Sequence, residues 1–382
     1  MHTKNTSEAN LMHDSPAPIE REAIMKLKTN NQSLFNFHMQ TQCTIGSESM
    51  DHIFSIMRSH GLHEPLWILP TEPNHKKTVK KLLESLYGKN PFATIDSEAL
   101  DSTLQTDSDS TQYDCLIACG NAACIDRAKL HITQQYTGET KKEYEKVAPL
   151  ALIVVPFGLL DGLECQGRIR QKGDTATLPI STPKHAVFDG RLCKKTTDKA
   201  IARTMCRSLL EICTTVLMTT DPIIRSMALL SFAQAYRSME IVNTMSRNKQ
   251  DWESCALFAG AALHAAGVCA ENRGTSVIIE FTETLANEGF ADYHQIAAAL
   301  IPAIMQHIGK TDPTIHQSIK LTLSGEDPTE FINSWITLSE AKGVDKIISR
   351  LREDYQALLT DSNHSRELDA LLEICSEQGA GE

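Results

Sequence analysis

The sequence predicts an α/β domain with a parallel sheet, followed by an all-helical domain. The chain has 382 residues, which is enough for two or three domains. Between residues 35 and 190, short apolar runs alternate with segments of helical periodicity, which is typical of a parallel sheet covered by helices. After residue 198, apolar residues recur at helical spacing and strand-like alternation almost disappears.

Three regions follow from this change of pattern. Residues 1–34 are rich in polar and charged side chains and are expected to form a flexible tail, because they cannot bury enough apolar surface to offset the entropy of ordering. The α/β domain is expected over residues 35–190 and the helical domain over residues 191–382. Asp189 and Gly190 offer turn chemistry at the boundary.

The elements of the first domain are expected where apolar runs end in turn residues. We expect strands over residues 66–69, 113–119 and 150–155, and helices over residues 77–87 and 122–131. In the second domain, the periodicity predicts helices over residues 201–217, 223–245, 252–268, 295–308 and 344–359.

Composition limits the classes of partner. The formal net charge is −11 and the sequence pI is about 5.7, so no broad basic surface for nucleic acid or anionic lipid is expected. No uninterrupted apolar stretch reaches the roughly 20 residues of a membrane helix, and the N-terminal residues lack the apolar segment of a signal peptide. The 11 cysteines lack the spacing of a disulfide scaffold, which indicates reduced thiols and a cytoplasmic protein.

Six segments carry a resemblance to a known family. The first, DCLIACGNAACIDRAK over residues 114–129, resembles a family pattern written D-x-I-I-A-x-G-G-G-S-x-x-D-x-A-K. The other five follow in the same order as in the family, over residues 149–164, 185–192, 202–211, 258–272 and 293–305. The chain resembles a diverged member of the iron-dependent (group III) alcohol dehydrogenases, relatives of the dehydroquinate synthases. The resemblance implies a Rossmann-like first domain and a cleft between the two domains.

The resemblance also implies where a metal would bind. Family enzymes hold a divalent cation on one carboxylate and three imidazoles, and these positions fall on Thr204, Ser208, Asn272 and Tyr293, or on His294 if the register slips by one residue. A further family histidine falls on Ser276, so the catalytic positions implied are Ser276, Tyr293 and His294. Hydroxyls and amides bind such cations far more weakly than carboxylates and imidazoles, so iron or zinc is not expected.

Other residues could supply a replacement metal site or other chemistry, each beside a simpler interpretation. A replacement set can be drawn from Glu211, His264, Glu271 and His294, although His264 lies in an apolar helix and fits a core histidine better. Three close cysteines, Cys115, Cys119 and Cys124, fit structural thiols better than a redox site. The basic residues over 168–172 and 194–195 fit solvated charge better than an anion site.

The implied cofactor contacts are altered as well. A glycine-rich turn between strand and helix lets backbone N–H groups approach a pyrophosphate. The resemblance places the cofactor contacts on a small set, in which alanines replace glycine and serine: Gly120, Asn121, Ala122, Ala123, Asp126 and Gly162. Asp126 and Lys129 also fit ordinary helix-surface residues, and the acid expected near the adenosine is replaced by Pro70 and Thr71, with Glu72 as a substitute. No cofactor is therefore the first expectation, and NAD(P) is the alternative.

The predicted function is that of a diverged iron-dependent alcohol dehydrogenase-like protein. Its metal ligands are mostly replaced, so we expect a pseudoenzyme without classical dehydrogenase activity that keeps the interdomain cleft for a small molecule or a protein partner. The alternative is an active NAD(P)-dependent alcohol or aldehyde oxidoreductase with substituted contacts, so the sequence leaves open whether the chain is an enzyme. A homodimer is compatible with either prediction, and neither nucleic acid nor a membrane is an expected partner.

Overall fold

The computed structural model describes residues 41–89, 92–100, 113–120, 122–137, 151–156, 168–171, 174–177, 183–193, 197–244, 249–273, 276–358, 366–367 and 369–371. The expected tail over residues 1–34 lies outside these ranges. Residues Phe37–Glu382 form one compact unit.

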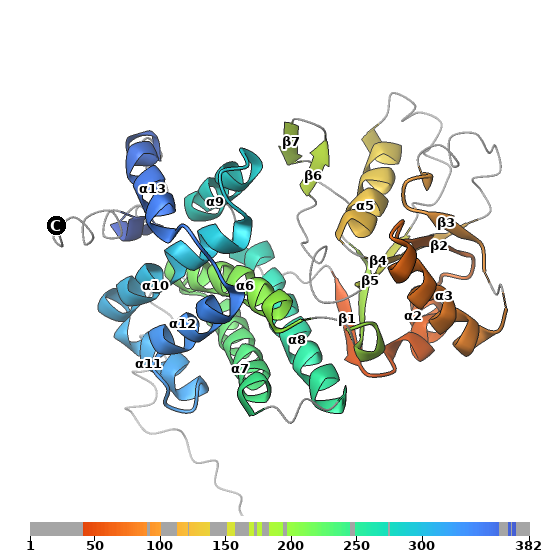
Figure 1. Ribbon diagram of the computed structural model, residues 1–382, viewed down its shortest axis with the longest axis horizontal. Helices are drawn as coiled ribbons and strands as arrows, with labels where there is room; N and C mark the ends of the chain where they lie inside the picture. The colour runs from red at the N-terminus through yellow and green to blue at the C-terminus, as the bar shows by residue number, and fades with distance from the viewer. Residues whose placement is uncertain are drawn as a thin grey trace, which may run out of the picture. The chain divides into compact units, whose positions relative to one another are not determined.

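Six strands of the described chain form one parallel sheet (Figure 1). Their order across the sheet is β1 (Gln42–Gly46), β8 (His185–Asp189), β5 (Ala151–Pro156), β4 (Cys115–Gly120), β2 (Pro65–Leu69) and β3 (Thr94–Asp96). Each residue of β4 and β5 is buried, because a parallel sheet with helices on both faces has no solvated side. The strands predicted over 66–69, 113–119 and 150–155 are confirmed as β2, β4 and β5.

Alternate residues of β4 enter two different apolar clusters. Leu116 and Ala118 pack with Cys124, Ile125 and other residues of helix α5 (Ala122–Thr137). Cys115, Ile117 and Cys119 belong to the second cluster, which also holds residues of helices α2 (Ile53–Ser59) and α3 (Pro73–Tyr87). Helices therefore cover both faces of the sheet, as the α/β prediction requires.

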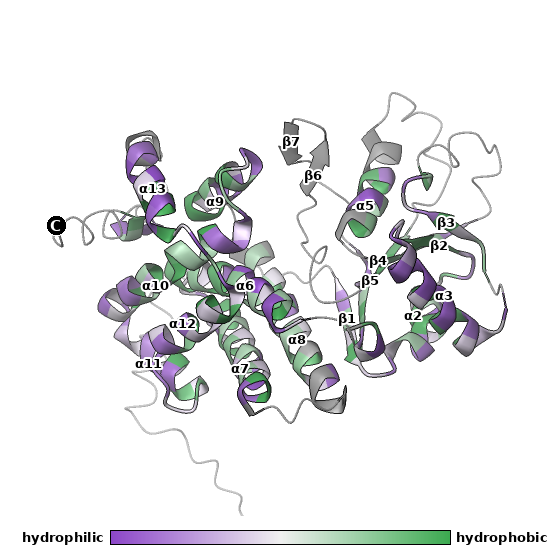
Figure 2. Cartoon of the chain, in the orientation of Figure 1, coloured by the Kyte–Doolittle hydropathy of each residue, from purple (hydrophilic) through white to green (hydrophobic). Residues whose placement is uncertain are grey.

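The rest of the described chain is mainly helical (Figure 1). The helices are α6 (Asp198–Met218), α7 (Pro222–Thr244), α8 (Lys249–Arg273), α9 (Val277–Asn287), α10 (Tyr293–Thr311), α11 (Pro313–Thr322), α12 (Pro328–Ser339) and α13 (Val344–Leu358). Helix α6 contacts α7, α8, α10 and α12, which explains why most of its length is buried. In contrast, Figure 2 colours much of α3 and α13 as hydrophilic.

Shorter elements complete the described chain. The 3-10 helices η1 (Ser49–His52) and η4 (Gly190–Cys193) follow β1 and β8, respectively. A separate antiparallel pair is formed by β6 (Arg168–Gln171) and β7 (Asp174–Thr177). Part of the predicted basic segment therefore lies on β6, while residues 172 and 194–195 lie outside the described residues.

One stretch of α8, Glu253–Ala270, is long and apolar enough by length and composition to cross a membrane. About half of its surface, 53%, is buried within the protein, and α8 packs against α6 and α7. This burial favours a helix packed in the protein core.

Candidate functional site

The two implied metal positions on α6 lie one helical turn apart and are both buried. Thr204 is 6% exposed, and its hydroxyl donates a hydrogen bond of 3.2 Å to the carbonyl of Ala200. Ser208 is 1% exposed, and its Oγ has no hydrogen-bond partner among the residues that the structure describes. A buried hydroxyl left in this state costs about 1–3 kcal/mol. The four-residue spacing is therefore present on a buried face of α6, with hydroxyls at the two positions where the resemblance implies a carboxylate and an imidazole.

Tyr293, the first residue of α10, lies against this part of α6. Its hydroxyl donates to Glu211 Oε1 over 3.5 Å, and the Arg207 guanidinium lies 4.7 Å from the centre of its ring. Arg207 and Glu211 are three and seven positions after Thr204, so they share its helix face. The structure thus brings Tyr293 to the α6 face that carries Thr204.

His294 lies beside the basic side of α6. Burial lowers its pKa, the positive charges of Arg203 and Lys199 lower it further, and Asp292 acts in the opposite direction. Lys199 also forms an ion pair with Glu340. His294 is therefore held as a neutral imidazole in a locally positive environment.

The donors that the structure describes at these positions, the hydroxyls of Thr204 and Ser208, do not fit a tightly bound iron or zinc ion. Within the described residues, no three His, Cys, Asp or Glu side chains come together in a way that could hold a metal. Hydroxyls such as those of Thr204 and Ser208 are poor ligands for these ions. Residue 272 continues helix α8, but its side chain lies outside the described residues, as does that of Glu271.

Ser276, at the remaining implied catalytic position, begins helix α9. Its Oγ accepts a hydrogen bond of 3.2 Å from the Ile279 N–H and donates to Glu367 Oε1, while Glu367 Oε2 accepts from the Val277 N–H at 2.8 Å. Ser276 and Glu367 are 2% and 1% exposed. A buried carboxylate at a helix N-terminus is stabilised by the helix dipole, so this pair attaches the C-terminal residues to α9.

The glycine implied in cofactor binding is explained by packing within the protein. Gly120 ends β4, and an added Cβ would lie 2.7 Å from Cys124 Cβ and 2.8 Å from Cys124 Sγ. The close approach between strand and helix therefore requires glycine at this position. Asn121 and Gly162 lie outside the described residues, and for Ala122 and Ala123 the structure describes only the backbone at the start of α5.

Asp126 and Lys129, also on α5, differ in their environments. Asp126 is 38% exposed, as expected for a helix surface, but the Lys129 side chain is only 1% exposed. Lys129 Nζ lies 4.0 Å from Asp126 Oδ1. The interpretation of Lys129 as a surface residue is therefore wrong, since the long side chain is enclosed by the protein.

Glu72, the residue considered as a substitute for the acid near the adenosine, has a local partner. Glu72 immediately precedes α3 and forms an ion pair with His75 Nδ1 at 2.6 Å. Lys76, one residue later, pairs with Asp96 at the end of β3. Glu72 is thus engaged within its own helical turn.

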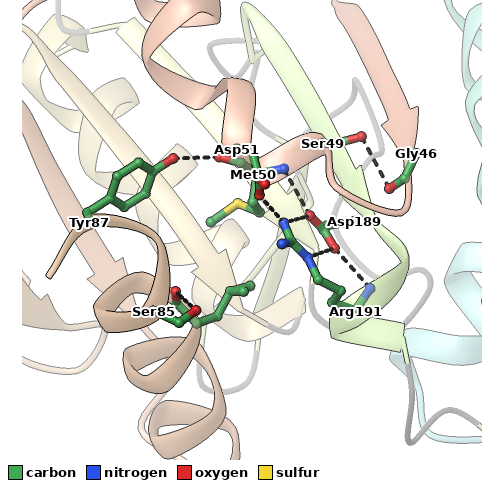
Figure 3. A network of polar contacts seen from close by, with 9 residues as sticks. Gly46, Ser49, Met50, Asp51, Ser85, Tyr87, Asp189 and Arg191 are labelled. Atoms are coloured by element: carbon green, nitrogen blue, oxygen red, sulfur yellow. Dashed lines mark hydrogen bonds and ion pairs between the residues drawn. The ribbon is translucent and has the colours of Figure 1, made fainter.

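A charged network at the end of β8 was not predicted (Figure 3). The fully buried Asp189 accepts hydrogen bonds from Met50 N–H at 2.9 Å and from Arg191, whose Nη2 also donates to Asp51 Oδ1 at 2.5 Å. These carboxylates raise the pKa of Arg191.

Tyr87 donates to the Met50 carbonyl at 2.6 Å, and burial with the nearby Asp51 raises the pKa of Tyr87 to about 12. The sequence signal that could have indicated this network is the pair of turn residues at the end of β8.

A second unpredicted cluster contains histidines. His185 Nε2 lies 2.8 Å from Thr44 Oγ1, and His185 Nδ1 lies 3.2 Å from His60 Nε2. Burial lowers the pKa of His185 to about 4, and His60 and His264 contribute to the shift. Burial also lowers the pKa of His264, which agrees with its interpretation as a core histidine.

The three close cysteines are buried thiols. Burial raises the pKa of Cys115 and of Cys124 to about 12, and raises that of Cys119 as well. A thiol held in its protonated form is a poor nucleophile and a poor metal ligand. The structural interpretation of these residues is therefore favoured.

No established protein-family profile matches the sequence, and no curated protein matches it either. Solved structures, in contrast, match its fold. A maleylacetate reductase from Agrobacterium tumefaciens is similar with a TM-score of 0.68 at 13% identity, over 90% of this chain and 97% of that one. A sulfoacetaldehyde reductase from Bifidobacterium kashiwanohense, in complex with NAD+, has a TM-score of 0.68 at 13% identity over 90% and 99%. An iron-containing alcohol dehydrogenase from Thermotoga maritima has a TM-score of 0.62 at 14% identity over 90% and 99%. The chain therefore has the fold of the iron-containing alcohol dehydrogenases.

Proposed function

We propose that this chain is a binding protein built on the fold of the iron-containing alcohol dehydrogenases, without metal-dependent dehydrogenase activity. The observation that supports this proposal most strongly is the chemistry of the α6 face. The hydroxyls of Thr204 and Ser208 stand where the resemblance implies a carboxylate and an imidazole, and Tyr293 contacts Arg207 and Glu211.

The missing ligands matter because of the chemistry that a cation supplies. A bound cation lowers the pKa of an alcohol, which prepares it to give up a hydride. The described side chains of α6 and α10 instead hold a neutral imidazole, two hydroxyls and an arginine stacked on a tyrosine. These groups can bind and orient a polar ligand, and they do not replace the cation.

Elemental analysis tests the proposal. We expect far less than one iron or zinc per chain in protein purified without chelator and then incubated with each metal and desalted. Stoichiometric retention of either metal would overturn the proposal. A variant combining Thr204→Asp, Ser208→His and Tyr293→His serves as the positive control, because it returns three strong ligands to the α6 and α10 positions.

A second candidate is an NAD(P)-dependent oxidoreductase with substituted contacts. One solved structure of the same fold contains NAD+. In this chain, α5 begins shortly after β4, at the carboxyl ends of the parallel strands, where such folds bind dinucleotides. Saturable energy transfer from tryptophan to NADH or NADPH would favour this candidate. We expect no saturable transfer, in keeping with the protein packing around Gly120.

The remaining proposals concern location and assembly. We propose a cytoplasmic protein that binds a small molecule in the interdomain cleft implied by the resemblance, with a protein partner as the alternative occupant. Sedimentation velocity of the purified chain distinguishes a monomer from a homodimer, and size-exclusion chromatography of a cell extract detects a larger complex.

A further inference from the structure

We propose that His60 and His185 form an acid-sensitive latch, in which one shared proton fastens the end of helix α2 to strand β8 and a further proton releases it. The segment that the latch controls is the turn over residues 60–64, which leads from α2 to β2. The proposal goes beyond the proposed function and is independent of it, because the latch lies apart from the α6 residues on which that function rests.

The two histidine rings face each other nitrogen to nitrogen. His60 Nε2 lies 3.2 Å from His185 Nδ1, and the ring centres are 5.5 Å apart with an angle of 70° between the ring planes. The separation of the centres exceeds that of the nitrogens by about two ring radii, so both nitrogens lie close to the line that joins the centres. This is the geometry of an N–H···N hydrogen bond, in which one nitrogen carries the hydrogen and the other accepts it.

His185 is the fixed member of the pair. It is the first residue of β8, it is 6% exposed, and its other ring nitrogen, Nε2, lies 2.8 Å from Thr44 Oγ1 on β1. Val187, two positions along β8 and therefore on the same face of the sheet, belongs to the apolar cluster that includes α2. His60 is half-buried and directly follows α2. The hydrogen bond between the histidines thus joins the end of a helix to a buried strand.

The turn after α2 is held by a small number of polar contacts. The Leu62 N–H donates to the Met57 carbonyl at 3.0 Å, and Gly61 adopts a φ of +71° with open space where a Cβ would lie. Further along, the Asp114 carboxylate accepts hydrogen bonds of 2.6 and 2.9 Å from the backbone N–H groups of residues 63 and 64. The turn therefore lies between two attachments, the histidine pair and Asp114.

Protonation acts on the histidine pair in two steps. An imidazolium and a neutral imidazole still share an N–H···N bond, because the charged ring donates and the neutral ring accepts. When both rings are protonated, each presents an N–H to the other, and the two positive charges repel. The bond therefore tolerates one added proton and breaks with the second.

The surroundings of the pair oppose the second proton. Burial lowers the pKa of His60 and of His185, and the positive charge of Lys184 lowers that of His60 further. His264, on α8, contributes to the shift of His185, whereas the Thr44 hydroxyl is neutral. The titratable side chains on the turn and at the end of α2 are exposed to solvent: Arg58, His63 and Glu64. The second proton is thus accepted mainly in an open state, in which the two rings have separated.

Hydrogen exchange of the full chain tests the latch. An exposed histidine has a pKa near 6.5, so each pH unit below about 6.5 should raise the open population by up to about tenfold. We expect the protection factors of the amides of residues 60–62, corrected for the intrinsic pH dependence of exchange, to fall by this factor down to about pH 5. Amides in α12 should keep their protection over the same range, which separates local opening from global unfolding.

Two variants assign the effect to the histidine pair. His60→Gln should abolish the fall in protection, because an amide side chain can donate to His185 or accept from it and does not titrate. His63→Gln is the matched control, since His63 lies on the same turn with an exposed side chain and should retain the fall.

Three results would overturn the proposal. The first is an equally steep fall in His60→Gln and in the unaltered protein, and the second is constant protection of residues 60–62 in the unaltered protein. The third comes from long-range proton–nitrogen NMR correlation of the histidine rings at neutral pH, which applies even if His60→Gln fails to fold. We expect one of the two facing nitrogens to carry a hydrogen and the other to carry none, so an equal state of both nitrogens would contradict the shared proton.

Discussion

The carboxylate of Asp189 and the guanidinium of Arg191 form a two-point contact at the end of β8. Arg191 Nε donates to Oδ1 at 2.9 Å and Nη2 donates to Oδ2 at 2.6 Å. The Arg191 backbone N–H also donates to Oδ1 at 2.9 Å. The buried charge of Asp189 is therefore matched by donors on the segment that leads from the sheet towards α6.

Removing this carboxylate should destabilise the protein strongly. Asp189→Ala is expected to lower the free energy of unfolding by about 3–5 kcal/mol, because breaking a buried ion pair leaves its partner uncompensated. Asp51→Ala removes the other carboxylate, which is 38% exposed, and should cost less than about 1 kcal/mol. Urea denaturation measures both variants, and equal losses would contradict the structural role given to Asp189.

Gly120→Ala should reduce stability through overpacking. The new Cβ would lie within 2.8 Å of Cys124 atoms, so the free energy of unfolding should fall by about 1–3 kcal/mol. Adding Cys124→Gly removes the clashing atoms, and the two substitutions together should cost less than the sum of their separate effects. Gly309→Ala, whose Cβ would meet the His316 ring at 3.3 Å, is a helical control with a smaller expected effect. Strict additivity in thermal denaturation would rule out the contact as the cause.

Glu367→Ala should loosen the start of α9. The substitution leaves the Val277 N–H and the Ser276 hydroxyl without their carboxylate, at a cost of about 1–3 kcal/mol. Hydrogen exchange of the amides of residues 277–279 should accelerate, whereas exchange in α12 should not. Glu330→Ala, on the exposed first turn of α12, is the matched control. Unchanged exchange at Val277 would show that the C-terminal residues do not hold this helix end.

Acidification should destabilise the protein through His185. The pKa of His185 is lowered to about 4 in the folded state and is about 6.5 in an unfolded chain, so the unfolded state binds more protons between these values. The contribution of His185 to the free energy of unfolding is therefore fully present above pH 6.5. About 1–3 kcal/mol of this contribution is lost as the pH falls towards 4. His185→Gln should flatten this pH dependence in urea denaturation, compared with His316→Gln on α11. An identical slope in His185→Gln and the unaltered protein would contradict the prediction.

Strands and helices with strong patterns were predictable from the sequence. The central strands β4 and β5 are continuous apolar runs because both of their faces are covered. The edge strands β1 and β3 were missed, since no residue of β1 is fully buried and β3 spans only three residues. Helices α9, α11 and α12 are short, and their starts depend on capping contacts such as that of Asp327 with Thr329 N–H.

The site was predictable only in part. Thr204 and Ser208, which the resemblance picked out four residues apart, lie on one buried face of α6 because helical geometry repeats locally. The stacking of Arg207 on Tyr293 and the bond between Ser276 and Glu367 join residues 86 and 91 positions apart. Such contacts depend on the packing of whole helices, which local sequence patterns do not contain. The sequence left open whether Lys129 lies on the helix surface, and its enclosure depends on the same packing.

The position of β1 at the edge of the sheet has a consequence for how the chain folds. Its partner β8 begins more than 140 residues later, as the bond from Thr41 Oγ1 to the Pro183 carbonyl, with a separation of 142, illustrates. At about 5–20 residues per second, a ribosome needs roughly 7–30 s to synthesise the intervening chain. During that interval β1 has no neighbouring strand to pair with, so the strands cannot join the sheet in the order in which they are synthesised. We expect the final attachment of β1 to be a late, non-local step that limits the rate of folding.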